Sequence, residues 1–336
     1  MGRMRNLQVR MAARPVGLPK PSDFSVIEAD IPAPAEGEVL LETIYLSVDP
    51  YMRGRMSEAK SYAAPMAVGD VMIGATVGRV VESKDASFRP GDHVEAYAGW
   101  QQYAALPGKT MRKLDAQIPL SASLGVCGIP GLTAYFGMFD ICHPKAGETL
   151  FVSGAAGAVG SCVGQIGKIL GCRVVGSAGA DDKVAWLKEL GFDAAFNYKS
   201  HPEPYKILRE LCPNGIDCYF DNVGGAVTDA VFAQMNAGAR IAICGQISQY
   251  NNTAPEMGPR LLALVLTRMA TVRGFIVTQY IKQFAEAYQQ LGQWVRAGKL
   301  QYKETVVDGL EQAPEAFIGL LQGANTGKML VRVRPE

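Results

Sequence analysis

The sequence predicts an α/β protein in which a doubly wound parallel sheet is joined to a second, mainly β domain. Short alternating segments broken by Gly and Pro fill the chain before about Thr133, which is typical of an all-β fold. After Thr133, apolar strand-like runs alternate with helical patterns, and repeated strand-helix units build a parallel sheet with helices on both faces. A chain of 336 residues with 48% hydrophobic residues is long and apolar enough to bury two cores.

The first part, residues 1–130, is expected to form the mainly β domain. Its segments include "VMIGATVGRVVES" and "RPGDHVEAYAGW", in which Gly and Pro separate stretches of alternating hydrophobicity. Such stretches predict half-buried strands joined by tight turns.

The middle part, residues 131–302, is expected to form the parallel sheet and its helices. The strand-like run "CRVVGSA" is followed by "DDKVAWLKELG", which predicts a helix. Asp181 and Asp182 lie in the first turn of this helix, where the helix dipole favours negative charge, and Lys188 lies near its end. Gly191 is then expected to terminate it.

The last part, residues 303–336, returns to a strand-helix-strand pattern. Two placements are open, because the segment either extends the parallel sheet or rejoins the first domain. We expect it to rejoin the first domain.

The composition argues against several classes of partner. The chain has 33 basic and 32 acidic residues, so no charge excess favours nucleic acid or an anionic membrane surface. Its apolar runs, such as Leu261–Leu266, are far shorter than the roughly 20 residues of a membrane-spanning helix. The seven cysteines include no C-x-x-C pair, which indicates reduced thiols in a cytoplasmic protein. We therefore expect a small-molecule partner, with neither nucleic acid nor membrane involved.

Three glycines stand in the segment "VSGAAGAVG", at positions 154, 157 and 160. A glycine-rich turn between a strand and a helix lets backbone N–H groups approach a pyrophosphate, and the start of the helix adds partial positive charge. The spacing G-x-x-G-x-x-G departs from the usual G-x-G-x-x-G. We interpret the turn as a dinucleotide site, and the alternative is a purely structural turn.

The end of the next strand indicates which dinucleotide is bound. NAD-binding folds usually place an acid about 20 residues after the glycines, on the ribose 2′-hydroxyl. Ser177, Ala178 and Gly179 occupy this stretch here, and Lys183 follows. This pattern favours NADPH, because no acid at the strand tip repels a 2′-phosphate. In the alternative, Asp181 or Asp182 contacts the ribose and Lys183 is merely solvated.

Several segments together resemble one family. They are "LSVDPYMRGRM", "GLTAY", "AAGAVGSCVGQIGKILGCRVVG", "GFDAAFNYK", "DCYFDNVGG", "RIAICGQISQYN", "RGFIV" and "NTGKMLV". The chain resembles, over nearly its whole length, the zinc-free branch of the medium-chain dehydrogenase/reductase superfamily, which contains prostaglandin reductases, leukotriene dehydrogenases and alkenal double-bond reductases. The resemblance implies a Rossmann-type NADP-binding domain, a GroES-like catalytic domain and NADP(H) as cofactor.

The resemblance also implies a set of site residues. Those expected to bind NADP(H) are Gly157, Ala158, Val159 and Gly160 at the pyrophosphate; Lys183 and Tyr198 at the 2′-phosphate; Asn222 at the adenosine end; Cys244, Gly245, Gln246, Ile247 and Ser248 along the cofactor; and Phe275, Ile276, Val277 and Asn325 at the nicotinamide. The two glutamines of "CGQISQYN" depart from the family pattern, which leaves the substrate open.

Four of these residues also have a structural interpretation. Tyr198 is alternatively a half-buried aromatic residue, Asn222 a turn former, Phe275 a core residue and Asn325 the cap of a turn. Their joint match to the family favours the functional interpretation.

We expect no metal site. A catalytic zinc in this superfamily needs a set of cysteine and histidine ligands. The chain has only His93, His143 and His201, and no cysteine precedes Cys127.

Without a metal, the reaction that is easiest to support is hydride transfer to the β-carbon of an α,β-unsaturated ketone or aldehyde. The product of this step is an enolate, and one hydrogen bond to its oxygen in a dry site lowers the barrier by about 3 kcal/mol. The hydroxyl of Tyr250 is the first candidate donor and that of Tyr51 the second; a ribose hydroxyl of the cofactor is a third. Tyr250 or water then protonates the α-carbon. Alternatively, Tyr250 is only a wall of the pocket and Tyr51 part of a turn with an Asp49–Arg53 ion pair.

Two other functions remain open from the sequence. One is quinone reduction, which also needs no metal, and the other is binding of NADPH without catalysis. The segment "MATVRGFIV" predicts a strand near the end of the nucleotide domain. In relatives such a strand pairs across a two-fold axis, so we expect a homodimer.

Overall fold

The chain forms two units in the computed structural model, which describes residues 5–336. Unit 1 contains the described residues up to Leu124, together with Glu304–Asn325 and Met329–Glu336. Unit 2 contains Gly125–Lys303 and Thr326–Lys328. Residues 1–4, which belong to the expected first domain, lie outside the described part.

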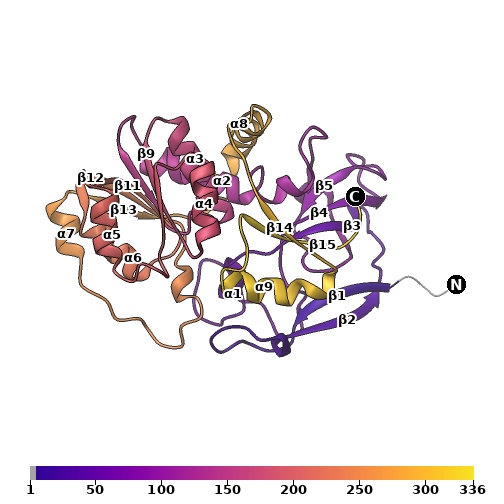
Figure 1. The fold of residues 1–336 in the computed structure, drawn as a ribbon. Helices are drawn as coiled ribbons and strands as arrows, with labels where there is room; N and C mark the ends of the chain where they lie inside the picture. The colour runs from indigo at the N-terminus through magenta and orange to yellow at the C-terminus, as the bar shows by residue number, and fades with distance from the viewer. Residues whose placement is uncertain (1–4) are drawn as a thin grey trace. The chain divides into compact units, whose positions relative to one another are not determined.

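Unit 2 is built on a six-stranded parallel sheet (Figure 1). Its strands are β8 (Thr149–Val152), β9 (Arg173–Ala178), β10 (Ala194–Asn197), β11 (Ile216–Asp221), β12 (Met235–Ile243) and β13 (Thr271–Gly274). They lie in the order β10-β9-β8-β11-β12-β13, and every neighbouring pair is parallel. Successive strands are added toward one edge of the sheet from β8 to β10 and toward the other edge from β11 to β13. The switch point lies between β8 and β11, which is where doubly wound sheets bind ligands.

Helices cover both faces of this sheet. The helices of unit 2 are α2 (Ile129–Phe136), α3 (Ala158–Ile169), α4 (Asp181–Glu189), α5 (Pro204–Leu211), α6 (Gly225–Phe232), α7 (Leu262–Thr267) and α8 (Phe284–Arg296). Leu150 and Phe151 of β8 point to opposite faces, as neighbouring strand residues do. A Cβ at Gly167 of α3 would lie 2.6 Å from Leu150, so glycine lets α3 pack closely on that face. Phe151 packs in the core with residues of α5 and α6, which lie side by side (Figure 1).

The helix predicted after β9 is confirmed as α4. Asp181 and Asp182 occupy its first turn and Lys188 its last. Gly191 follows with a φ of +89°, a left-handed conformation that glycine adopts without strain and that commonly ends a helix.

Unit 1 is mainly β. Its strands are β1 (Arg5–Met11), β2 (Phe24–Asp30), β3 (Glu38–Ser47), β4 (Thr76–Ser83), β5 (His93–Ala96), β6 (Tyr103–Pro107), β7 (Arg112–Lys113), β14 (Glu304–Asp308) and β15 (Lys328–Arg332), and its helices are α1 (Tyr51–Arg55) and α9 (Ala313–Leu321). The larger sheet has the order β14-β15-β3-β4-β5-β7, with β6 also paired to β3, and β1 pairs with β2 in a separate ribbon. The predicted fold class, a doubly wound parallel sheet with a mainly β domain, is confirmed.

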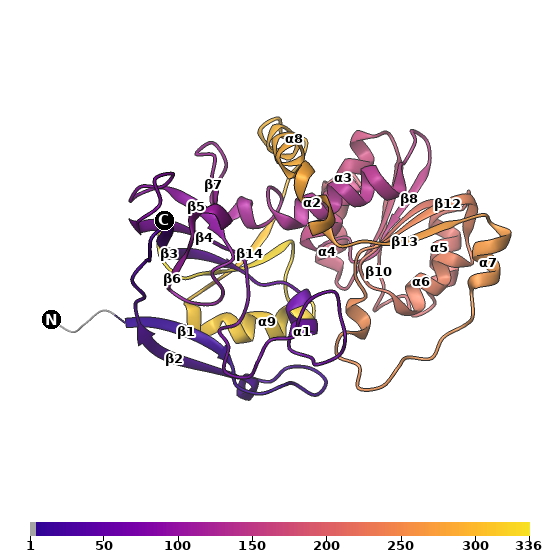
Figure 2. The same cartoon turned by 180° about the vertical axis from the view of Figure 1, so that it is seen from behind.

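The C-terminal segment belongs to the sheet of unit 1. β15 runs antiparallel to β3, with Leu330 opposite Ser47. The segment therefore does not extend the parallel sheet. Helix α9 of the same segment lies beside the β1–β2 ribbon (Figures 1 and 2), where Phe317 packs edge to face on the fully buried Trp100 at a ring distance of 5.9 Å.

Among residues 5–336, no helix combines the length and the apolar character needed to cross a lipid bilayer.

Candidate active site

The expected cofactor residues of unit 2 follow the strands of the parallel sheet one by one. Residues 157–160 follow β8, Lys183 follows β9, Tyr198 follows β10, Asn222 follows β11, residues 244–248 follow β12, and residues 275–277 follow β13. Because the strands are parallel, their carboxyl ends meet at one edge, and the structure brings these residues together there. Tyr51 and Asn325 belong to unit 1.

Two of the three glycines in the turn after β8 are required by the fold itself. Gly154 has a φ of +58°, which side chains disfavour. A Cβ at Gly160 would lie 2.5 Å from the carbonyl oxygen of Gly154, so any side chain there would clash with the turn. These two glycines allow the turn and the close start of α3.

Gly157 is different, because internal packing does not require glycine there. A Cβ at this position would contact only the carbonyl oxygen of Gly154, at an ordinary 3.4 Å. Gly157, Ala158 and Val159 are partly exposed, and no side chain caps the start of α3. The N–H groups of the first helical turn are therefore accessible to an anion, and this geometry fits a pyrophosphate.

Lys183 and Tyr198 lie at the tip of β9. The hydroxyl of Tyr198 is 2.8 Å from the place where a Cβ of Gly179 would stand, so glycine makes room for the phenol. The Lys183 side chain is half-buried, and this burial lowers the pKa of its amine; Asp182 opposes the effect and nearby Lys199 adds to it. A partly desolvated ammonium beside a second cation is stabilised by an anionic ligand, so these residues fit a 2′-phosphate.

Asp221 is a fully buried carboxylate at the end of β11 that the sequence analysis did not single out. Its oxygens accept hydrogen bonds from side chains of Ser153, Tyr219, Thr228 and Gln246, and from the backbone N–H groups of Val223 and Gly224. Many donors stabilise a carboxylate that is removed from water. Asp221 thus ties together the chain segments that follow β8, β11 and β12. The only sequence signal for it is an acid at the end of the apolar run "CYFD".

Asn222 joins the ends of β8 and β11. Its side-chain amide donates to the carbonyl of Ser153 at 2.8 Å, and its backbone N–H donates to the Ser153 hydroxyl at 3.0 Å. The structure thus assigns Asn222 a part in the turn, and its contact with the adenosine end stays a prediction.

Tyr250 lies in the segment between β12 and α7, directly after a short 3-10 turn, η5 (Ile247–Gln249). Its hydroxyl oxygen accepts a hydrogen bond from the backbone N–H of Gln246 at 3.3 Å. A Cβ at Gly245 would lie 3.1 Å from the same oxygen, so the lack of a side chain at Gly245 leaves room for the Tyr250 hydroxyl. The loop is held on β11, because the N–H groups of Cys244 and Gly245 donate to the carbonyl of Asp221.

Tyr51 is the first residue of α1 in unit 1. Its hydroxyl oxygen is buried, and among residues 5–336 it has no hydrogen-bond partner of acceptable geometry. Burial raises the pKa of the phenol, and nearby Tyr97 and Asp49 add to this effect. The hydroxyl therefore stays protonated. In the adjoining turn, Asp49 accepts a hydrogen bond from Ser47, and Arg53 donates to the carbonyl of Gly17 at 2.9 Å.

The residues expected at the nicotinamide differ in exposure. Phe275 is 7% exposed and meets the ring of Phe220 edge to face at 6.1 Å. Ile276 is 37% exposed, whereas Asn325, which belongs to unit 1, is 8% exposed. Ile276 is the more accessible member of the Phe275–Val277 segment.

Within the described residues, no three His, Cys, Asp or Glu side chains gather as metal ligands would. The cysteines of this part of the chain are free thiols. Burial raises the pKa of the thiols of Cys162 and Cys244 to about 12, so both are protonated at neutral pH.

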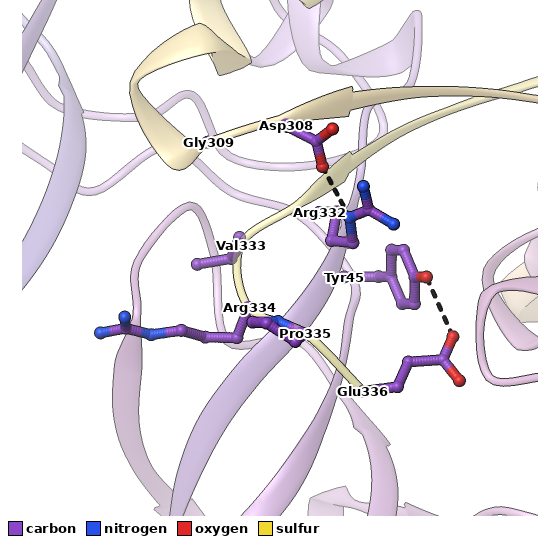
Figure 3. Close-up of a pocket in the computed structure, with 8 residues that line it drawn as sticks. All are labelled: Tyr45, Asp308, Gly309, Arg332, Val333, Arg334, Pro335 and Glu336. Carbon is purple, nitrogen blue, oxygen red and sulfur yellow. Dashed lines mark hydrogen bonds and ion pairs between the residues drawn. The ribbon is translucent and has the colours of Figure 1, made fainter.

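A cavity of about 540 Å³ lies in unit 1, and none of its lining residues is an expected site residue (Figure 3). Asp308 pairs with Arg332 at 2.6 Å on one side, and the Tyr45 hydroxyl donates to Glu336 at 2.9 Å on the other. The remaining lining residues are Gly309, Val333, Arg334 and Pro335.

Two sequence families match the chain. The family described as "N-terminal domain of oxidoreductase" matches residues 7–114, and the family described as "Zinc-binding dehydrogenase" matches residues 158–294.

Individual relatives match over almost their whole length. The NADPH-dependent curcumin reductase of Escherichia coli is 48% identical, with 98% of each chain covered. Prostaglandin reductase 1 of Sus scrofa is 47% identical, with 94% of this chain and 96% of the relative covered. The crystal structure of CurA from Vibrio vulnificus in complex with NADPH matches with a TM-score of 0.94 and 48% identity, over 98% of this chain and 100% of CurA. The chain therefore belongs to the medium-chain dehydrogenase/reductase superfamily, in the branch of the prostaglandin, curcumin and alkenal reductases.

Proposed function

We propose that this chain reduces the carbon-carbon double bond of α,β-unsaturated ketones or aldehydes with NADPH, by hydride transfer to the β-carbon and without a metal. The observation that carries the proposal is that the expected cofactor residues of unit 2 lie together at the carboxyl edge of the parallel sheet, each group following its own strand. The curcumin reductase and prostaglandin reductase names of two relatives that are almost half identical support the substrate class.

We also propose that the two units have different functions. Unit 2 corresponds to the NADP-binding domain expected at residues 131–302, and unit 1 to the catalytic domain expected at residues 1–130 and 303–336. The glycine turn, Lys183 and Tyr250 all belong to unit 2, whereas Tyr51 belongs to unit 1.

The cofactor, when bound, supplies the hydride. Residues 157–160 hold its pyrophosphate with the N–H groups at the start of α3. Lys183 and Tyr198 bind the 2′-phosphate and so favour NADPH over NADH. Asn222 and residues 244–248 line the adenosine and central parts, while Phe275, Ile276, Val277 and Asn325 flank the nicotinamide.

Tyr250 is the proposed donor to the substrate oxygen. Its hydroxyl oxygen accepts the Gln246 N–H, so this contact does not use the hydroxyl proton. As the enolate forms, the Tyr250 hydroxyl donates to its oxygen, and the N–H of Gln246 stabilises the negative charge that the phenol oxygen gains. One such donor lowers the barrier by about 3 kcal/mol. Tyr51 is the second proposed donor, because its hydroxyl is buried and makes no hydrogen bond of acceptable geometry to residues 5–336. Tyr250 or water then protonates the α-carbon.

A panel of substrates tests this proposal. An alkenal, an enone and a benzoquinone are assayed by the loss of NADPH absorbance, with NADH as the control. We expect turnover of the alkenal and the enone, and faster turnover with NADPH than with NADH. Turnover of the quinone alone reassigns the enzyme to quinone reduction, and tight NADPH binding without any turnover reassigns it to a binding role.

We propose that the active protein is a cytoplasmic homodimer. β13 is an edge strand of the parallel sheet, and its residues Thr271–Gly274 are all exposed. Nearby on the chain, Leu262 is 80% exposed and Leu266 77%. An open strand edge with exposed apolar residues favours pairing with a second copy. Light scattering then gives a dimer mass for the wild type and a monomer mass for Leu266→Glu; a monomeric wild type rules the dimer out.

A further inference from the structure

Asn197, the last residue of β10, connects the start of α4 to the turn that follows β10. Its side-chain amide donates to Oδ1 of Asp181 at 2.8 Å. Its side-chain oxygen accepts the backbone N–H of Lys199 at 3.0 Å, and its carbonyl accepts the backbone N–H of His201 at 3.1 Å. One half-buried side chain thus contacts both the start of α4 and the turn after β10.

The hydrogen bond from Asn197 to Asp181 holds the acidic residue that follows β9 most closely in the sequence. Asp181 is the first residue of α4, and in the alternative interpretation of the sequence it or Asp182 contacts the ribose of NAD. The Asn197 amide occupies one carboxylate oxygen and fixes the orientation of the group. A neutral donor does this without adding a second negative charge beside the 2′-phosphate subsite.

The contact with Lys199 shapes the turn that carries Tyr198. The Tyr198 N–H donates to the carbonyl of Ala178 at 3.0 Å, which holds the turn against β9. The turn also brings Lys199 close enough to Lys183 that the two cations repel each other. A phenol and two ammonium groups thus stand near one another, an arrangement that binding of a phosphate dianion stabilises.

We propose that Asn197 is a positioning residue for dinucleotide choice: by holding the Asp181 carboxylate and the Tyr198–Lys199 turn, it builds the subsite that distinguishes a 2′-phosphate from a 2′-hydroxyl. The inference rests on the proposed function, in which NADPH is the cofactor. Asn197 acts through Asp181, Tyr198 and Lys199 and itself need not touch the dinucleotide.

Binding of 2′,5′-ADP and of 5′-AMP, measured by calorimetry, tests the inference without turnover. In Asn197→Asp, the new carboxylate still accepts the Lys199 N–H, so the turn is kept, but it faces Asp181 with a like charge. We expect 2′,5′-ADP binding to weaken about tenfold and 5′-AMP binding to change less than about threefold. The double variant Asp181→Asn/Asn197→Asp restores an amide–carboxylate pair with the roles exchanged, and we expect it to recover affinity to within about threefold of wild type.

Asn197→Ala is the second variant, because it removes both side-chain contacts without introducing a charge. We expect it to weaken 2′,5′-ADP more than 5′-AMP as well. If the wild type prefers 2′,5′-ADP but these variants weaken both ligands equally, or if the double variant recovers nothing, the inference is wrong while the proposed function stands. If the wild type binds both ligands equally, the proposed cofactor choice is wrong, and the inference is overturned with it.

Discussion

The backbone N–H of Gln246 donates to the hydroxyl oxygen of Tyr250 at 3.3 Å, across one short turn. The side chain of the same Gln246 donates to the buried carboxylate of Asp221 at 2.8 Å. The candidate proton donor is therefore supported by a loop that is itself attached to the end of β11. The hydroxyl oxygen is an acceptor in this contact, and a phenol that accepts a hydrogen bond is a better donor to a developing oxyanion.

Tyr250→Phe removes this donor and keeps the ring. We expect turnover of an enone to fall at least about tenfold, because the enolate oxygen loses a hydrogen bond in the transition state. The dissociation constant for NADPH, measured by fluorescence titration, stays nearly unchanged. Tyr205→Phe is the matched control, since Tyr205 is an exposed tyrosine of α5 outside the site. Equal turnover in Tyr250→Phe and wild type would remove the donor role.

Lys183→Ala tests the 2′-phosphate contact. The half-buried ammonium of Lys183 is expected to pair with this phosphate, so its loss weakens NADPH by about tenfold or more and NADH only slightly. Lys188→Ala, in the last turn of the same helix, is the control and leaves both affinities unchanged. Parallel weakening of NADPH and NADH in Lys183→Ala would show that no 2′-phosphate contact exists there.

The alternating patterns of the sequence were sufficient to predict the fold class, because each pattern depends on neighbours a few residues apart. The helix after β9 is an example, since its acids, Lys188 and Gly191 all lie within one short segment. The roles of Gly154 and Gly160 in the turn follow from local geometry in the same way.

Contacts between distant segments were not predictable from these patterns. Asp221 receives hydrogen bonds from Ser153, which lies 68 positions earlier, and from Gln246, which lies 25 positions later. Asn197 reaches back 16 positions to Asp181. An acid and an asparagine at strand ends look like ordinary turn formers in the sequence, and only the parallel arrangement of the strands brings their partners to them.

Metal removal tests the proposed metal-free reaction. We expect dialysis against a strong chelator to leave enone turnover unchanged, because the proposed donors are the phenols of Tyr250 and Tyr51. Elemental analysis of the purified protein is expected to find no stoichiometric zinc. A loss of turnover that added zinc restores would contradict the proposal.

The pair of Glu148 and Arg240 gives unit 2 a pH-dependent stability. Each side chain is 20% exposed, and Arg240 donates to the Glu148 carboxylate. Burial is the largest single effect and raises the pKa of Glu148. The hydrogen bonds from Arg240 and from the Lys145 backbone, together with the charges of both residues, outweigh burial, so the pKa lies below its ordinary value of 4.5. The folded pKa is below the unfolded one, so the contribution to the free energy of unfolding is full above about pH 4.5 and is lost as the pH falls through the lowered pKa.

Glu148→Gln is therefore expected to cost about 2 kcal/mol of unfolding free energy near neutral pH, and less as the pH falls. Urea unfolding at about pH 7 and about pH 3.5 measures the difference between variant and wild type. Glu203→Gln is the control, because Glu203 is 74% exposed and its contact with Lys206 is long, at 3.9 Å. A Glu148→Gln effect of the same size at both pH values would contradict the assignment.

Asp221→Asn tests whether the buried carboxylate organises the carboxyl edge of the sheet. The asparagine amide keeps one oxygen but turns the other acceptor into a donor, which then faces donors such as the Gln246 amide. Hydrogen bonds to a charged group are lost and a buried donor is left without an acceptor, so we expect a cost of about 3 kcal/mol in unfolding free energy. Asn236→Ala is the control, because the Asn236 amide also links two segments but contacts Asp217 in a partly exposed place. The second measurement is NADPH affinity. We expect it to fall, because the segments that contain Ser153, Asn222 and Gln246 lose the carboxylate that holds them together. Unchanged stability together with unchanged affinity would show that Asp221 does not organise this edge.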